Sequence, residues 1–251
     1  MNKLWKQYGE ILHESLSYIF KRATGEIKSL KSPWQSFNAI GMNGIEWNSL
    51  YVLASRPSTG KTLINSTLAR GLQQLNKDQD FAVLHFQFEM LGRNLGIREL
   101  SAGTKLNIRY IQSADDYGMP PLSEQDKHRL MDYARSQSGR EEYVIDKPLT
   151  VFQMAETIEA FYAEVRKPFI VTLDHTLLVR QDASEASRQV TLQNLATMLV
   201  EKKNKLPVAF IILTQLNREI DDADRQKPGQ LSNYPGEADV YGSKQKIGPI
   251  I

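Results

Sequence analysis

The chain has 251 residues, 41% of them hydrophobic, which is enough to bury one large core. Its formal net charge of +2 gives no basic field over the whole molecule, so a nucleic-acid surface would have to be local. The absence of cysteine excludes disulfides, cysteine zinc ligands and a cysteine nucleophile. No apolar run reaches the roughly 18 residues of a membrane helix and no signal peptide is evident, so we expect a cytoplasmic protein without a membrane partner.

Residues 1–22 form the first predicted element, an amphipathic helix. Leu4, Tyr8, Leu12, Leu16 and Ile19 recur at helical spacing, with polar residues between them. Such a helix either packs on its own domain or docks on another subunit. The second interpretation is supported by the position of this short helix outside the main α/β pattern, where its own chain offers little surface for it to pack against. The pattern is nevertheless compatible with both interpretations.

Residues 23–48 are predicted to be a connector, since glycine and proline interrupt them. Residues 49–251 then alternate apolar runs with amphipathic stretches, which indicates right-handed crossovers and an α/β fold with a mainly parallel sheet flanked by helices. Ligands bind at the carboxyl ends of the strands in such sheets. The expected strands are Leu50–Ala54, Phe81–Phe88, Tyr143–Ile145, Phe169–Leu173 and Val208–Leu213, and the expected helices are Leu63–Leu75, Leu91–Ala102, Leu122–Ser136, Val151–Val165 and Gln189–Lys205.

The first strand leads into a phosphate-binding loop. Residues 54–62, ASRPSTGKT, approximate the pattern G-x-x-x-x-G-K-[ST] between a strand and a helix, with Ser55 in place of the first glycine. Backbone N–H groups of such a loop face a polyphosphate, while Lys61 adds a positive charge and Thr62 a hydroxyl suited to Mg²⁺. The residues expected to hold the nucleotide are Arg56, Pro57, Ser58, Thr59, Gly60, Lys61 and Thr62.

Carboxylates follow two later strands. Glu89 comes after the second strand, where it could polarise the water that attacks a γ-phosphate, or could instead favour the N-terminus of the next helix. Asp174 closes the run Phe169–Leu173, as in a Walker B segment, where it would lie near Mg²⁺, although aspartate is also a common turn residue. His175 has no second histidine or cysteine at ligand spacing, so we interpret it as structural.

Gln215 comes just after the last predicted strand. Its amide could donate to a γ-phosphate oxygen and report whether that phosphate is present, although a polar residue capping a strand is the simpler alternative. Together the strand ends describe one site for the hydrolysis of MgATP to ADP and phosphate. In that site Lys61, Glu89 and Gln215 are the expected catalytic residues, and Thr62 and Asp174 the expected metal-binding residues.

These segments resemble those of the DnaB-type replicative helicases, whose phosphate-binding loops also carry Arg-Pro-Ser and lack the first glycine. Residues 86–90, FQFEM, are similar to the family's Phe-Ser-Leu-Glu-Met block, which puts Glu89 on its catalytic glutamate. Asp174 matches the Walker B aspartate, although His175 departs from the usual tyrosine. Residues 214–218, TQLNR, are similar to Ser-Gln-Leu-Asn-Arg. The resemblance covers the chain from the linker onward.

The resemblance implies a RecA-like P-loop ATPase domain that assembles into a homo-oligomeric ring, usually a hexamer, around single-stranded DNA. Residues 1–22 lie where the family has its linker helix, and a primase or a helicase loader would be a further partner. We expect the domain at 49–251 to be incomplete at its C-terminus, before a basic finger that in such ATPases is worth about 10³–10⁵ in rate. The architecture suggests a bacterial protein, or a phage or mobile-element protein in a bacterial host.

The contact with DNA is the least specified part of the sequence. Residues 221–247 form a long polar segment in which Arg225, Lys227, Lys244 and Lys246 could bind DNA phosphates, although acidic residues make its charge mixed. The leading hypothesis is an ATP-driven helicase. The alternatives are a RecA-like switch, recombinase or loader that does not unwind DNA, and an assembly module that binds ATP without turnover.

Overall fold

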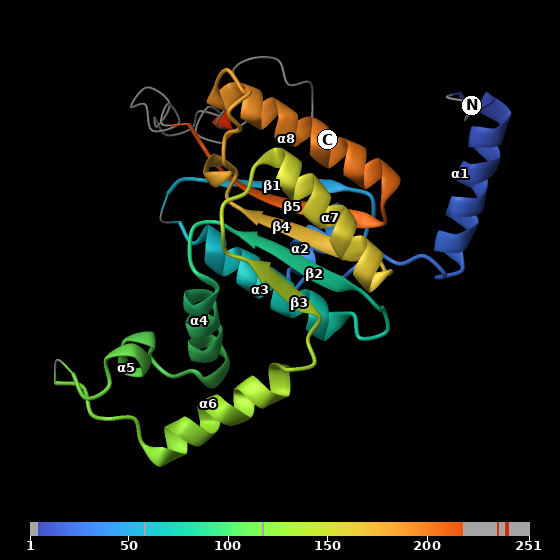
Figure 1. The fold of residues 1–251 in the computed structure, drawn as a ribbon. Helices are drawn as coiled ribbons and strands as arrows, with labels where there is room; N and C mark the ends of the chain where they lie inside the picture. Colours follow the sequence, from blue (N-terminus) through green and yellow to red (C-terminus); the bar gives the residue numbers. More distant parts are fainter. Residues whose placement is uncertain (1–4, 58, 117, 218–234, 236–238, 241–251) are drawn as a thin grey trace, which may run out of the picture.

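The computed structural model describes residues 5–57, 59–116, 118–217, 235 and 239–240. In these residues, strands form one sheet in the order β1-β5-β4-β2-β3, and every neighbouring pair is parallel (Figure 1). The predicted parallel α/β fold is therefore confirmed. The strands are β1 Leu50–Ser55, β2 Ala82–Gln87, β3 Glu142–Ile145, β4 Phe169–Asp174 and β5 Val208–Gln215.

Helices connect the strands and cover both faces of the sheet (Figure 1). Two six-residue helices, α2 and α5, escape sequence prediction because they are too short for a hydrophobic period. None of the described helices is long and apolar enough to cross a lipid bilayer. The helices are α1 Tyr8–Ala23, α2 Gln35–Ile40, α3 Lys61–Leu75, α4 Gly92–Thr104, α5 Ile108–Ser113, α6 Glu124–Gln137, α7 Val151–Val165, the 3₁₀ turn η1 Thr176–Leu178, and α8 Arg188–Lys205.

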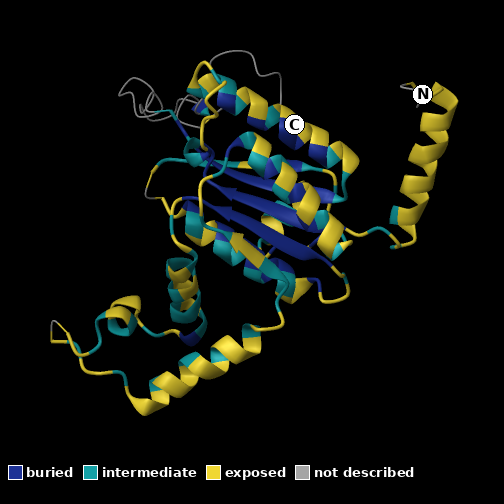
Figure 2. Cartoon of the chain, in the orientation of Figure 1, coloured by how far each residue is buried: buried dark blue, intermediate teal, exposed yellow. Residues whose placement is uncertain are grey.

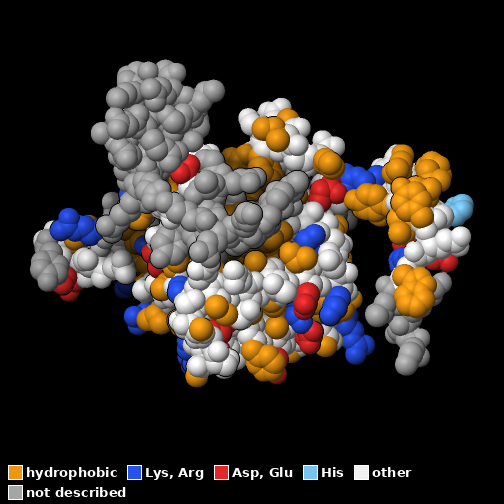
Figure 3. Space-filling view, turned by 90° about the horizontal axis from the view of Figure 1, so that it is seen from above, with side chains coloured by type: hydrophobic (Ala, Val, Ile, Leu, Met, Phe, Trp, Pro, Cys, Tyr) orange, Lys and Arg blue, Asp and Glu red, His pale blue; other side chains and the backbone are white. Residues whose placement is uncertain are grey.

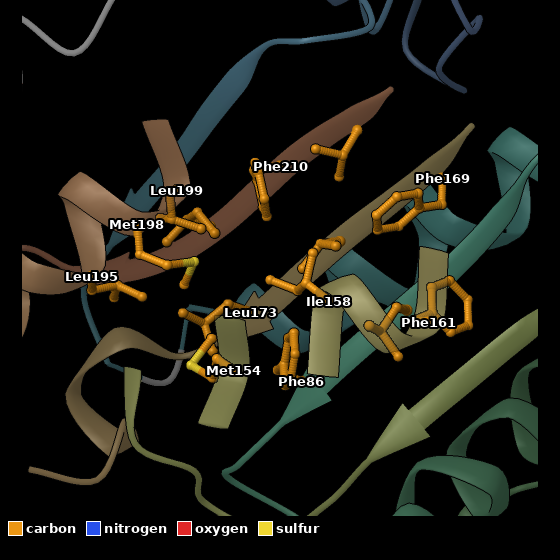
Figure 4. Packing of buried hydrophobic residues seen from close by; sticks show 14 of the residues in the cluster. Phe86, Met154, Ile158, Phe161, Phe169, Leu173, Leu195, Met198, Leu199 and Phe210 are labelled. Carbon is orange, nitrogen blue, oxygen red and sulfur yellow. The ribbon is translucent and has the colours of Figure 1, made fainter. Parts of the chain in front are cut away.

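The central strands are covered on both faces, so successive residues alternate between two cores. β2 and β4 are buried throughout, and β5 is buried up to its last residue. One core lies under α7 and α8, where Phe86, Leu173 and Phe210 of the strands belong to the same hydrophobic cluster as Met154 and Leu199 of the helices (Figure 4). The other core lies under α3. Burial on both faces explains why these strands are nearly continuous apolar runs in the sequence.

The segment 23–48 packs into the second core. Leu30 and Ile45 are 0% and 1% exposed, pair as an antiparallel bridge, and join Leu68 and Leu72 of α3. Glycine and proline predict the turns of this segment, but they do not reveal that its apolar residues pack into the core. Much of the predicted connector is therefore part of the folded domain.

Helix α1 stands away from the body of the molecule, and none of its residues is buried (Figures 1 and 2). Leu12, Leu16 and Ile19 are 49%, 46% and 55% exposed, and the space-filling view shows hydrophobic side chains on this helix facing open space (Figure 3). Near its C-terminal end, Arg22 forms an ion pair with Glu46 at 2.7 Å. The hydrophobic face of α1 therefore finds no cover within the described part of the chain.

A cluster of charged side chains ties α4 and α6 to α3. The Glu99 carboxylate accepts hydrogen bonds from Arg70 on α3, at 2.7 Å, and from Tyr133 on α6, at 2.7 Å. Arg140 also donates to Glu99, at 2.9 Å. A Cβ at Gly103 would lie 1.9 Å from the Tyr133 ring, so only glycine permits this approach of α4 to α6.

Candidate functional site

The carboxyl ends of four neighbouring strands bring the predicted site residues to one edge of the sheet. The register pairs Ser55 of β1 with Gln215 of β5, and Asp174 of β4 with Gln87 of β2. The phosphate-binding loop follows β1 at this edge, and Glu89 follows β2. The parallel pairing thus places side by side residues that are far apart in the sequence.

The loop between β1 and α3 ends in a conformation that suits phosphate binding, because it leads directly into the N-terminus of a helix. Gly60 has a φ of +91°, a region that side chains disfavour, and α3 begins at the next residue. Thr59 Oγ1 donates to the Arg56 carbonyl at 2.7 Å, which closes the loop on itself. Pro57 is exposed, and Ser58 lies outside the described residues.

Lys61 turns its ammonium group back into this loop. The residue is 9% exposed, and its Nζ donates to the carbonyl oxygens of Ser55 and Arg56 at 3.4 and 3.2 Å. These long hydrogen bonds to neutral acceptors can be exchanged for bonds to phosphate oxygens, which are charged and stronger acceptors. Arg56 itself reaches the end of β5, where its Nη1 lies 3.4 Å from the Leu216 carbonyl oxygen.

Asp174 is the best-enclosed polar group at this edge. Its side chain is 0% exposed, and Oδ2 accepts from Thr62 Oγ1 at 2.7 Å and from Gln87 Nε2 at 3.3 Å. Oδ1 is buried and has no hydrogen-bond partner among the described residues. A buried carboxylate oxygen without a donor is costly unless a ligand completes it, so Thr62 and Asp174 fit Mg²⁺ or its water.

This cation would depend on the nucleotide for most of its ligands. Within the described ranges, no group of three or more histidine, aspartate and glutamate side chains could hold a metal ion. Mg²⁺ in nucleotide sites uses one or two protein ligands together with phosphate oxygens and water, so one carboxylate and one hydroxyl suffice.

Glu89 and Gln215 flank this pair. Glu89 is exposed just beyond β2, and the preceding residue, Phe88, donates its N–H to the Asp174 carbonyl at 2.9 Å. In the described part of the chain, no side chain is bonded to the Glu89 carboxylate, which leaves it open to solvent. Gln215 is half-buried and ends β5 beside Ser55.

His175 lies against the site without pointing to a metal role. It is 7% exposed, and its Nδ1 accepts the Leu177 N–H at 3.3 Å, which caps the η1 turn. Burial lowers the pKa of His175 below its ordinary value, against the attraction of the Glu89 and Asp174 carboxylates. A neutral imidazole that caps a turn agrees with the structural interpretation made from the sequence.

Gln87 is the site residue that sequence reasoning missed. It is 1% exposed and bonded to Asp174, yet it entered the sequence argument only as part of residues 86–90. A signal existed, because His85 and Gln87 are polar residues two positions apart in an apolar run and therefore share one face of the strand. The residues proposed for DNA, Arg225, Lys227, Lys244 and Lys246, lie outside the described residues.

Comparison with known proteins relates the fold and the site to one family. Residues 30–235 match the family model described as DnaB-like helicase C terminal domain. The replicative DNA helicase DnaB of Buchnera aphidicola (strain Sg) is 23% identical over 277 aligned residues, which cover 98% of this chain and 57% of that protein. DnaB of Helicobacter pylori (strain J99) is 26% identical over 189 residues, which cover 74% of this chain and 36% of that protein.

Solved structures show the same fold. One solved ATPase domain superposes with a TM-score of 0.74 at 20% identity, covering 93% of this chain and 78% of that chain. A DnaB-like replicative helicase, determined with its interactions with primase, superposes with a TM-score of 0.72 at 20% identity, covering 91% of this chain and 53% of that chain. The chain spans about half the length of the first curated relatives it matches.

Proposed function

Because the chain belongs to the DnaB-like helicase C-terminal domain family, we propose that it is the ATP-hydrolysing motor domain of a replicative DNA helicase that moves along single-stranded DNA. The observation that carries the proposal is the contact of Thr62 with the buried Asp174 carboxylate, at 2.7 Å, beside the phosphate-binding loop. A hydroxyl and a carboxylate at this position serve a nucleotide-bound cation, and a purely structural domain would have no use for the carboxylate oxygen left without a donor.

The chain's own residues would divide the work of hydrolysis. Backbone N–H groups at the start of α3 and the Lys61 ammonium bind the phosphates. Thr62 and Asp174 would hold Mg²⁺, which would neutralise charge on the phosphates. The Glu89 carboxylate accepts hydrogen bonds from the attacking water and takes up its proton as the bond to the γ-phosphorus forms. ADP leaves with the electron pair of the broken bond, and inorganic phosphate is the second product.

Gln215 would connect this chemistry to DNA. It ends β5 at the loop edge, and the chain continues from it into the segment that carries the proposed DNA-binding residues. An amide that donates to the γ-phosphate loses that partner after hydrolysis, so the following segment can differ between the ATP and ADP states.

Assembly would use the exposed helix α1. Its uncovered hydrophobic face suits docking on a second copy of the chain, in a ring that we propose to be hexameric. The solved DnaB-like helicase interacts with primase, which makes a primase a reasonable partner here, and a helicase loader is the other. The site of action would be the bacterial cytoplasm, for a host protein or for a phage protein expressed there.

Two measurements with the protein encoded by the whole gene test this proposal. ATP hydrolysis that rises when single-stranded DNA is added supports a DNA-dependent motor, and displacement of a labelled strand from a forked duplex supports a helicase. Hydrolysis without strand displacement would favour a RecA-like switch, recombinase or loader. Absence of ATP turnover under both conditions would refute the motor and leave an assembly module.

A further inference from the structure

Gln87 is a buried polar side chain whose position is set by Asp174. It ends β2 in register with Asp174 of β4, so the two side chains leave the sheet on the same face, toward α3. Its Nε2 donates to Asp174 Oδ2 at 3.3 Å, and the residue is 1% exposed. Burying a glutamine amide costs free energy, so a role for this buried side chain has to be found.

We propose that Gln87 is a positioning residue for ATP hydrolysis, which holds the Asp174 carboxylate so that Oδ1 is directed to the cation. The proposal rests on the proposed ATPase function. It goes beyond that function because neither the family pattern nor the phosphate-binding loop assigns a role to this position.

The geometry around Asp174 carries the argument. The last side-chain torsion of an aspartate is soft, so packing alone does not decide which oxygen faces which neighbour. Two donors converge on Oδ2, Thr62 from α3 and Gln87 from β2, while Oδ1 has no partner among the described residues. With Oδ2 occupied from both sides, Oδ1 is the oxygen left for the cation or its water.

Thr62 cannot do this alone. Its hydroxyl is itself expected to bind the cation, so its direction changes with the state of the site. Gln87 is enclosed in the sheet and independent of the nucleotide, so it provides a fixed reference for the carboxylate. A residue that hydrogen-bonds to a metal-binding side chain in this way usually contributes about 10–100-fold to metal affinity or activity.

Gln87 also separates Asp174 from a neighbouring cleft. This cleft has a volume of about 260 Å³ and is lined by Gln87 together with Asn65, His85 and Glu142, among others. A shorter residue at this position would open Oδ2 to water from the cleft. Water would then compete with Thr62, and the carboxylate would be free to rotate.

The test replaces Gln87 with methionine, which keeps the length of the side chain and removes its donor. Gln73→Met is the matched control, because Gln73 Nε2 is also buried but has no partner in the described structure, near the far end of α3. Binding of a fluorescent ADP analogue is measured with Mg²⁺ and with EDTA, melting temperatures are measured without nucleotide, and ATP hydrolysis is measured across Mg²⁺ concentrations.

We expect Gln87→Met to raise the Mg²⁺ concentration for half-maximal hydrolysis about tenfold, as for the loss of one hydrogen bond to a charged group. Affinity for the ADP analogue should fall with Mg²⁺ and stay equal to the parent in EDTA. Gln73→Met should match the parent in both. Gln87→Ala, which also lacks a side-chain donor and opens the cleft, should show the same selective loss, and it replaces the methionine variant in the test if that variant does not fold.

Equal Mg²⁺ dependence in a folded Gln87 variant and the parent would overturn the positioning role. Equal losses of affinity in Mg²⁺ and in EDTA would do so too, because they indicate a merely structural effect. A parent protein that binds no ADP analogue in either condition would instead refute the proposed ATPase function itself, and the inference with it.

Discussion

Thr62 Oγ1 lies 2.7 Å from Asp174 Oδ2, although the two residues are 112 positions apart in the chain. One comes from the first turn of α3 and the other from the end of β4. They meet because α3 connects β1 to β2, and β4 lies between these two strands in the sheet, next to β2. The carboxylate in this contact is fully buried, with one oxygen lacking a donor among the described residues. Such a group is kept for binding rather than for stability.

Asp174→Asn should therefore separate activity from stability. We expect ATP hydrolysis to fall by about 10²-fold, since the cation loses the charge that holds it. The melting temperature without nucleotide should stay equal or rise, because a neutral amide is less costly to bury than a carboxylate. Calorimetry beside a phosphate-release assay checks both. A large drop in melting temperature would mean that Asp174 is a structural residue.

Glu89→Gln should stop hydrolysis while ATP still binds. The amide can hydrogen-bond to water but cannot take up its proton, so the rate should fall by about 10²–10⁴-fold. Glu164→Gln is the control, because Glu164 is an exposed glutamate on α7, remote from the sheet edge. Nucleotide binding is followed by fluorescence and turnover by phosphate release. Hydrolysis at the parental rate in an assembled ring would refute the role of Glu89 as the base.

Gln215→Ala should uncouple DNA affinity from the nucleotide state. The residue ends β5 beside the phosphate-binding loop. Its amide would supply one hydrogen bond to the nucleotide, in addition to the contacts of the loop with the phosphates, so its loss should leave ATP affinity nearly unchanged. The difference in single-stranded DNA affinity between the ATP and ADP states should disappear. Fluorescence anisotropy with a labelled oligonucleotide measures this, and Gln74→Ala on the exposed side of α3 is the control. The same nucleotide dependence in variant and parent would refute the coupling.

Leu16→Asp should dissociate the assembly without unfolding the domain. No residue of α1 is buried, so the domain does not need this helix, whereas burial of Leu12, Leu16 and Ile19 against a second copy would contribute about 1.5–3 kcal/mol for each fully buried side chain. Ser17→Asp adds the same charge at the neighbouring position and should have less effect. Light scattering beside circular dichroism checks the result. An unchanged oligomer in a variant lacking residues 1–20, which retains Arg22 and its pair with Glu46, would rule out the docking role.

Glu99→Gln should lower stability in a pH-dependent way. Burial acts to raise the pKa of Glu99, but hydrogen bonds from Arg70 and Tyr133 outweigh it, and the pKa lies below its usual range. A lowered pKa in the folded state stabilises the fold above the unfolded pKa of about 4.3, and this contribution is lost as the pH falls through the folded pKa. The parent should thus exceed the variant by about 2 kcal/mol in unfolding free energy at pH 7.

That difference should shrink as the pH falls below about 4.3, because a carboxylate whose pKa is lowered in the folded state contributes progressively less stability there. Urea unfolding at pH 7 and near pH 3 measures it. Glu124→Gln, which removes an exposed pair with Lys127, is the control and should change little. A variant as stable as the parent at pH 7 would show that the Glu99 cluster does not hold α4 and α6 to the domain.

Local patterns in the sequence predicted the elements that bury continuous apolar runs. β4 and β5 were expected because their apolar runs are nearly continuous, with Thr172 as the one polar residue in the run 169–173, and α7 was expected with the bounds Val151–Val165 that the structure has. The phosphate-binding loop was also readable, since its function depends on backbone conformation over a few consecutive residues. Each of these features is determined within about a dozen consecutive residues, by hydrophobic periodicity and local backbone conformation.

Contacts between distant segments were decided only by the tertiary structure. The order β1-β5-β4-β2-β3 determines that Asp174 meets Gln87, and no period in the sequence specifies which strands become neighbours. Likewise, the glycines and proline of segment 23–48 predicted turns, but the burial of Leu30 and Ile45 depends on the surface of α3 that receives them. For α1 the sequence was compatible with packing on its own domain and with docking on another subunit. A hydrophobic stripe indicates that a surface must be covered, but not which surface covers it. The structure leaves Leu12, Leu16 and Ile19 exposed, so within the described residues the domain itself does not supply that surface.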